Sequence, residues 1–95
     1  MNPTDEFNKR FPRGTRVRGI VRSHVRFGYF VNILEPKSLG LVDTTLFEPS
    51  EKEKIPEVGS EIEAVILQYR NTKVPHFRLS AHPYDFANSK PIRSI

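Results

Sequence analysis

Hydrophobic and polar residues alternate with a period of two in two neighbouring stretches of the chain, residues 15–26 and 28–34. In the first stretch, small and aliphatic residues share one face and arginines the other. In the second, the odd-numbered positions are apolar, whereas Phe30 and Asn32 fall on the opposite face. A period of two is typical of half-buried β-strands. The predicted inward residues are Val17, Gly19, Val21, Tyr29, Val31 and Ile33.

Three further stretches, residues 39–43, 61–69 and 76–81, are also predicted to be strands, the last with Phe77 and Leu79 inward. The polar stretch 44–55, which contains a proline, is expected to form only short helical turns. Five short strands with a longer insertion after the third favour a small closed barrel over a sandwich. We therefore expect an all-β fold, a five-stranded OB-fold barrel, with short helical turns between strands 3 and 4.

Three segments follow from this pattern. Residues 1–11 have no periodicity and are expected to be a flexible N-terminal segment, residues 12–81 form the barrel, and residues 82–95 form a C-terminal tail. Gly19 lies in the middle of the first strand, where a glycine indicates a sharp bend or a bulge.

Composition narrows the protein class. The chain has 95 residues, a formal net charge of +4 and no cysteine. Its length fits one domain, and the lack of cysteine excludes disulfides, thiolate zinc sites and a cysteine nucleophile. No apolar run approaches the ~18 residues of a membrane helix, and the N-terminal residues lack the apolar core of a secretory signal. We expect a cytoplasmic protein with no membrane partner.

The charge is unevenly distributed along the chain. Residues 9–26 carry seven basic side chains and no acidic one, residues 35–63 carry eight acidic against three basic, and residues 64–95 carry five basic against one acidic. Five of the first seven cations are arginines within residues 13–26. Because a guanidinium offers a planar fork to phosphate and stacks on bases, this run indicates nucleic-acid binding.

Several runs of sequence, in this order, resemble the S1-type RNA-binding domain. They are GTRVRGIV from residue 14, FGYFV from residue 27, GLV from residue 40, VGSEIEAV from residue 58 and RLS from residue 78. The resemblance covers residues 11–81. It implies a five-stranded OB barrel that binds single-stranded RNA on one face.

The resemblance also implies site residues. The two aromatics of its F-G-x-F motif, here Phe27 and Phe30, are expected to stack on bases. The family often has histidine after G-L-V, where this chain has Asp43, whose carboxylate would accept a hydrogen bond from a base amino group or from a neighbouring arginine. His76 stands where the family commonly has a basic residue on the last strand, with Arg78 beside it on the same face.

Pattern and chemistry alone add four residues to this candidate site. Arg16, Arg18 and Arg22 lie on the outward face of the first strand and would contact phosphates beside the aromatic pair. Asn32 lies on the outward face of the second strand, where its amide would bond a base edge. The candidate nucleic-acid site therefore comprises Phe27, Phe30, Arg16, Arg18, Arg22, Asn32, Asp43, His76 and Arg78.

No motif of catalysis, cofactor or metal binding appears. The three histidines are far apart without metal-ligand spacing, and the sequence has neither a nucleophile elbow nor a phosphate-binding P-loop. The glutamates of residues 48–57 read as a solvated acidic loop. We expect no enzyme activity, no cofactor and no metal.

Two functions remain in view. The first is binding of single-stranded RNA with low sequence specificity, through aromatic stacking and arginine–phosphate contacts. The second is a protein–protein interaction module, such as an inhibitor, an immunity-type protein or a ribosome-associated adaptor. Asp43, the acidic residues 48–63 and the hydrophobic residues of the tail motivate the second, because a fold does not fix a function.

Overall fold

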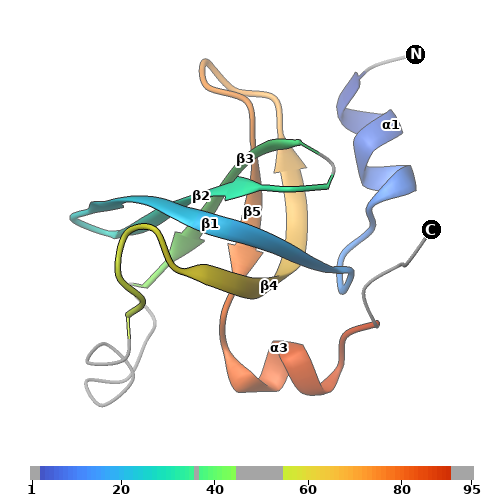
Figure 1. The fold of residues 1–95 in the computed structure, drawn as a ribbon. Coiled ribbons are helices and arrows are strands. Elements are labelled where there is room, and N and C mark those ends of the chain that lie inside the picture. Colours follow the sequence, from blue (N-terminus) through green and yellow to red (C-terminus); the bar gives the residue numbers. More distant parts are fainter. Residues whose placement is uncertain (1–2, 36, 45–54, 91–95) are drawn as a thin grey trace.

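The computed structural model describes residues 3–35, 37–44 and 55–90. Its strands are β1 (Arg16–Val25), β2 (Gly28–Ile33), β3 (Ser38–Asp43), β4 (Glu61–Arg70) and β5 (His76–Ser80). They close into a barrel in the order β1-β2-β3-β5-β4, with β3 and β5 parallel and the other pairs antiparallel (Figure 1). The predicted all-β, five-stranded OB-type barrel is confirmed.

The interior of the barrel follows the alternation in the sequence. Every residue predicted to point inward from the first two strands is buried, and so are Phe77 and Leu79 of β5. Burial also raises the pKa of the Tyr29 hydroxyl above its usual value, which keeps this core side chain neutral. The core comprises Val17, Val21, Tyr29, Val31, Ile33, Val42, Ala64, Ile66, Phe77 and Leu79.

Of the two alternatives expected at Gly19, a sharp bend or a bulge, the bulge is not found. Gly19 pairs in continuous register with Ile33 of β2 and Ile62 of β4. A Cβ atom at this position would lie 2.3 Å from Cγ1 of Val31 and 2.7 Å from the Asn32 carbonyl oxygen, so the glycine permits close approach of β2. The register of β1 against β2 shifts three residues later, between Val21 and Ser23, where Arg22 is the extra residue.

A helix, α1 (Pro3–Arg10), stands where the sequence predicted no regular structure. The reason is tertiary: Phe7 stacks on Tyr69 with ring centroids 4.6 Å apart, and Phe7 and Phe11 each form a T-shaped pair with Phe77. The Asn8 side-chain oxygen also accepts a hydrogen bond from the Tyr69 backbone N–H at 3.0 Å. Short helices owe most of their stability to such packing, which a local pattern does not reveal.

The tail likewise contains a short helix, α3 (Pro83–Ala87), where none was predicted. His82 caps it by accepting a hydrogen bond from the Tyr84 backbone N–H, and the proline stands in the first turn.

Helical turns predicted between strands 3 and 4 fall mainly on residues 45–54, outside the described residues. The division into residues 1–11, 12–81 and 82–95 stays a prediction.

None of the helices within the described part of the chain is long and apolar enough to span a membrane.

Candidate nucleic-acid interface

One outer surface of the barrel carries most of the predicted site residues, and we call it the aromatic face. Strand register aligns Ser23, Phe30, Leu41 and Arg78 in one row across β1, β2, β3 and β5. The side chains in this row are all partly exposed. The next row aligns Ile20 of β1, Asn32 of β2 and Leu39 of β3. Phe30 and Asn32 therefore lie outward as predicted, because the neighbouring Tyr29, Val31 and Ile33 fill the core.

A shallow hollow of about 300 Å³ opens on this face. It is lined by Arg22, Ser23, Phe30, Leu39 and Val74. Arg22 comes from the bulge in β1, and Val74, which is 58% exposed, comes from the β4–β5 loop. An aromatic ring, apolar side chains and an arginine are the chemistry that receives a stacked base and its phosphate.

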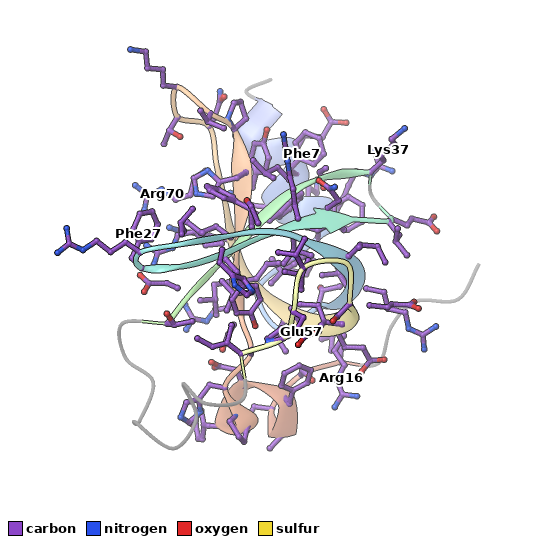
Figure 2. All side chains as sticks on the ribbon, turned by 60° about the vertical axis from the view of Figure 1, so that its left-hand side comes forward. Phe7, Arg16, Phe27, Lys37, Glu57 and Arg70 are labelled. Atoms are coloured by element: carbon purple, nitrogen blue, oxygen red, sulfur yellow. The ribbon has the colours of Figure 1, made fainter. Side chains whose placement is uncertain are left out.

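Phe27 lies at the tip of the β1–β2 hairpin. Val25 pairs with Gly28, so Arg26 and Phe27 form the turn between the two strands. The Phe27 side chain is 46% exposed, while its backbone carbonyl accepts a hydrogen bond from the Thr44 N–H at 2.9 Å. Figure 2 shows Phe27 and Arg70 on the same side of the molecule. The ring is therefore held on a fixed backbone and is available for contact.

Asp43 lies beside Arg78, which answers one question left open by the sequence. Nη2 of Arg78 donates to Oδ2 of Asp43 at 3.2 Å, and both side chains are about one-third exposed. The carboxylate therefore pairs with a neighbouring arginine, one of the two partners that the sequence suggested for it. The ion pair holds the guanidinium beside Asp43 and partly offsets its charge.

His76 lies at the start of β5, opposite Arg70 of β4. Its Nδ1 is 2.8 Å from the Val74 carbonyl oxygen. Since a carbonyl only accepts, Nδ1 must carry the proton in this bond. The remaining ring nitrogen, Nε2, then has its lone pair or a second proton for a ligand. His76 and Arg78 share one face as predicted, because Phe77 between them is buried.

Arg16 does not join the aromatic face. Its Nε donates to the Ser89 hydroxyl at 2.6 Å, and its Nη2 donates to the Phe86 carbonyl at 3.0 Å. The guanidinium also lies 5.6 Å from the centroid of the Phe86 ring. Figure 2 places Arg16 at the lower right of the view, well apart from Phe27 at the left. The tail binds this arginine, an interaction that β1 alone could not reveal.

Arg18 remains outward but has a partner on the neighbouring strand. Its Nε lies 3.5 Å from Oε1 of Glu63, and both side chains are substantially exposed. An exposed pair of this kind contributes little to stability. The pair does lower the local positive potential. Of the three arginines predicted on the first strand, Arg22 alone lines the hollow with Phe30.

Replacing Arg16 by methionine should destabilise the fold by about 1–2 kcal/mol, because two hydrogen bonds and a ring contact are lost. Urea unfolding followed by circular dichroism measures this loss. Arg18→Met is the matched control and should change stability by less than about 0.5 kcal/mol. Equal effects of the two substitutions would contradict the structural role of Arg16.

Sequence reasoning missed several parts of this surface. Leu39 and Leu41 had no chemistry to single them out, although their outward position follows from the parity of β3. Val74 belongs to the β4–β5 loop, which is far along the chain from the other residues that line the hollow. Within the described residues, no group of three His, Asp or Glu side chains could hold a metal ion.

Comparison with known proteins identifies structural neighbours. No family model matches the sequence, and no curated protein matches it significantly. The chain is similar to a crystal structure of a multidomain protein with nucleic acid binding domains from Streptococcus pneumoniae, with TM-score 0.57, 23% identity, and coverage of 87% of this chain and 29% of that one.

Two further solved structures have the same degree of likeness. The solution structure of GSP13 from Bacillus subtilis has TM-score 0.57 and 23% identity, over 77% of this chain and 61% of that one. An uncharacterized protein from Methanocaldococcus jannaschii has TM-score 0.54 and 23% identity, over 75% and 92%. The chain spans less than two thirds of the first two proteins. At these identities the likeness shows the shared barrel fold.

Proposed function

We propose that this protein binds single-stranded RNA on the aromatic face, without strong sequence preference and without catalysis, cofactor or metal, in the cytoplasm. The observation that carries the proposal is the hollow that holds Phe30 and Arg22 together. The exposed Phe27 at the hairpin tip supplies a second ring. Rings of this kind stack on any base, and only an unpaired base offers its flat surface.

Three further features support this proposal. The F-G-x-F motif of residues 27–30 resembles that of S1-type RNA-binding domains, which favours RNA over DNA. The β4–β5 loop contributes Val74 to the hollow, and OB barrels bind oligonucleotides with the loop between strands 4 and 5 together with the loop between strands 1 and 2. The similar Streptococcus pneumoniae protein is described as having nucleic acid binding domains, and we extend that property to this chain as part of the proposal.

Titration of fluorescent oligo-U and oligo-A of about six nucleotides at several salt concentrations tests the function. Contact with three to five phosphates predicts that log K falls with log[salt] at a slope of roughly −2 to −3.5. The two sequences should bind within about threefold of each other, since stacking tolerates every base. A duplex of the same length should bind much more weakly. Dissociation constants above about 1 mM at low salt would refute RNA binding.

The Asp43–Arg78 ion pair favours a second candidate, a protein-interaction module. It partly offsets the charge of the face and leaves the apolar side chains of Phe30, Leu39, Leu41 and Val74 as contact area. A surface of that composition also fits a protein partner, including a ribosomal one. Pull-downs from native cytosol with and without nuclease separate the two functions. Nuclease-resistant partners favour the protein module, and loss of every partner after nuclease rejects it.

A further inference from the structure

Four cations lie on segments at the side of the barrel away from the Phe27 hairpin, and we call them the basic end cluster. Lys9 and Arg10 come from the last turn of α1, Arg13 from the turn that leads into β1, and Lys90 from the stretch after α3. All four residues are exposed. Figure 1 shows α1 and the stretch after α3 on one side of the barrel, with the β1–β2 hairpin reaching out on the opposite side.

Backbone hydrogen bonds join the turn before β1 to the stretch after α3. The Lys90 N–H donates to the Gly14 carbonyl at 2.8 Å, and the Gly14 N–H donates to the Ile66 carbonyl at 2.8 Å. Lys90 also forms a parallel bridge with Thr15. Arg13 and Lys90 are therefore neighbours, although 77 positions (90 − 13) separate them in the sequence.

In the described part of the chain, the two acidic residues of α1 offset only part of the formal charge of this cluster. The ion pairs there are Arg18–Glu63 and Arg78–Asp43, and neither includes a cation of the cluster. Asp5 and Glu6 lie four positions before Lys9 and Arg10 on the same helix and favour these two cations. Lys9 and Arg10 favour the C-terminal end of the α1 dipole, but that does not account for Arg13 or Lys90. Like charges held together repel one another, and a polyanion relieves that repulsion.

The cluster is separate from the aromatic face. From Arg22 to Arg13 the chain runs nearly the length of β1, about 30 Å at ~3.3 Å per residue. Between these ends, Arg18 pairs with Glu63 and Arg16 is bound by the tail. The outer surface thus has two positive zones with a nearly neutral stretch between them.

We propose that the basic end cluster binds phosphates of the same single strand after it leaves the aromatic face, and so lengthens the binding site. This proposal rests on the proposed function of the aromatic face. A strand that only fills the hollow would not reach the cluster, whereas a longer strand would contact both zones. OB barrels occupy from about 4 to 16 nucleotides, which includes both cases.

The test uses the full chain and oligo-U of about 15 nucleotides, over roughly 50 to 200 mM salt. The fourfold variant Lys9→Gln/Arg10→Gln/Arg13→Gln/Lys90→Gln should make the slope of log K against log[salt] shallower by about 2–3, since each phosphate contact contributes ~0.7. Arg13→Gln/Lys90→Gln should make it shallower by about 1.4. This second variant leaves α1 unchanged and guards against loss of the helix. An oligo-U of about five nucleotides should bind the wild type and both variants alike.

Different outcomes overturn the two proposals. An unchanged slope for both variants on the long oligonucleotide, with wild-type binding intact, rejects the basic end cluster alone. Equal losses on the short and long oligonucleotides also reject it, because they indicate a general effect of net charge. If a Phe27→Ala/Phe30→Ala variant binds the long oligonucleotide as well as the wild type does, the aromatic-face function fails instead.

Discussion

Replacing both Phe27 and Phe30 by alanine should weaken binding of a six-nucleotide oligo-U by roughly 30-fold or more. Stacking contributes about 1–3 kcal/mol per base, so losing both rings should cost at least about 2 kcal/mol of binding free energy. The salt dependence of the remaining binding should stay as in the wild type, because no cation is removed. Fluorescence anisotropy at several salt concentrations measures both quantities.

The control for this prediction is Tyr84→Ala. Tyr84 is an aromatic residue 69% exposed on α3, so it is a surface ring like Phe27 but lies outside the aromatic face. Its removal should change oligo-U affinity by less than about twofold. Because Phe30 is partly buried, thermal unfolding of the double variant must first show that the barrel stays folded at the assay temperature. Wild-type affinity in a folded double variant would refute stacking on these rings.

Gly28→Ala should destabilise the barrel by about 3 kcal/mol or more. This glycine belongs to the F-G-Y-F stretch and is buried where β2 pairs with Asp43 of β3. An added Cβ would lie 1.9 Å from the Val42 carbonyl oxygen and 3.0 Å from its carbonyl carbon. Both atoms belong to the backbone, so β2 and β3 would have to separate, at a cost above that of ordinary overpacking. Urea unfolding or the thermal midpoint reports the loss.

Gly59→Ala provides the comparison for Gly28→Ala. Gly59 adopts a positive φ of 92°, but no atom lies within 4 Å of an added Cβ. Only the backbone conformation opposes alanine there, at about 1–2 kcal/mol. If Gly28→Ala cost no more than Gly59→Ala, the close approach of β2 and β3 would not be the reason for this glycine. In that case, a loss of RNA affinity in Gly28→Ala would have to arise from a change at the aromatic face and not from destabilisation of the barrel.

The strands were predictable because the alternation of apolar and polar residues along a strand shows directly which of its faces is buried. The alternation in residues 15–26 and 28–34 reflects one face in the core and one outside, and the structure has β1 and β2 with the same parity. The two helices were not predictable in this way. Phe7 and Phe11 acquire their role from Tyr69 and Phe77, which lie far along the chain.

The residues of the candidate site also fall into those that the sequence could place and those that it could not. Parity alone was enough to place Phe30 and Asn32 on the outer surface, and the F-G-x-F motif pointed to Phe27. Neither the parity nor the motif could place Val74 in the hollow, because the β4–β5 loop reaches that hollow only once the barrel has closed.

The sequence by itself determined five strands, their inward residues and a strongly basic first third of the chain. The tertiary structure decided what each cation does. Arg22 lies with Phe30, Arg18 pairs with Glu63, Arg16 is bound by the tail, and Arg13 lies beside Lys90 at the other end. The physical reason is that burial repeats along a strand every two residues and can be read locally. The partner of a charge depends on which distant segments the closed barrel brings within a few ångströms.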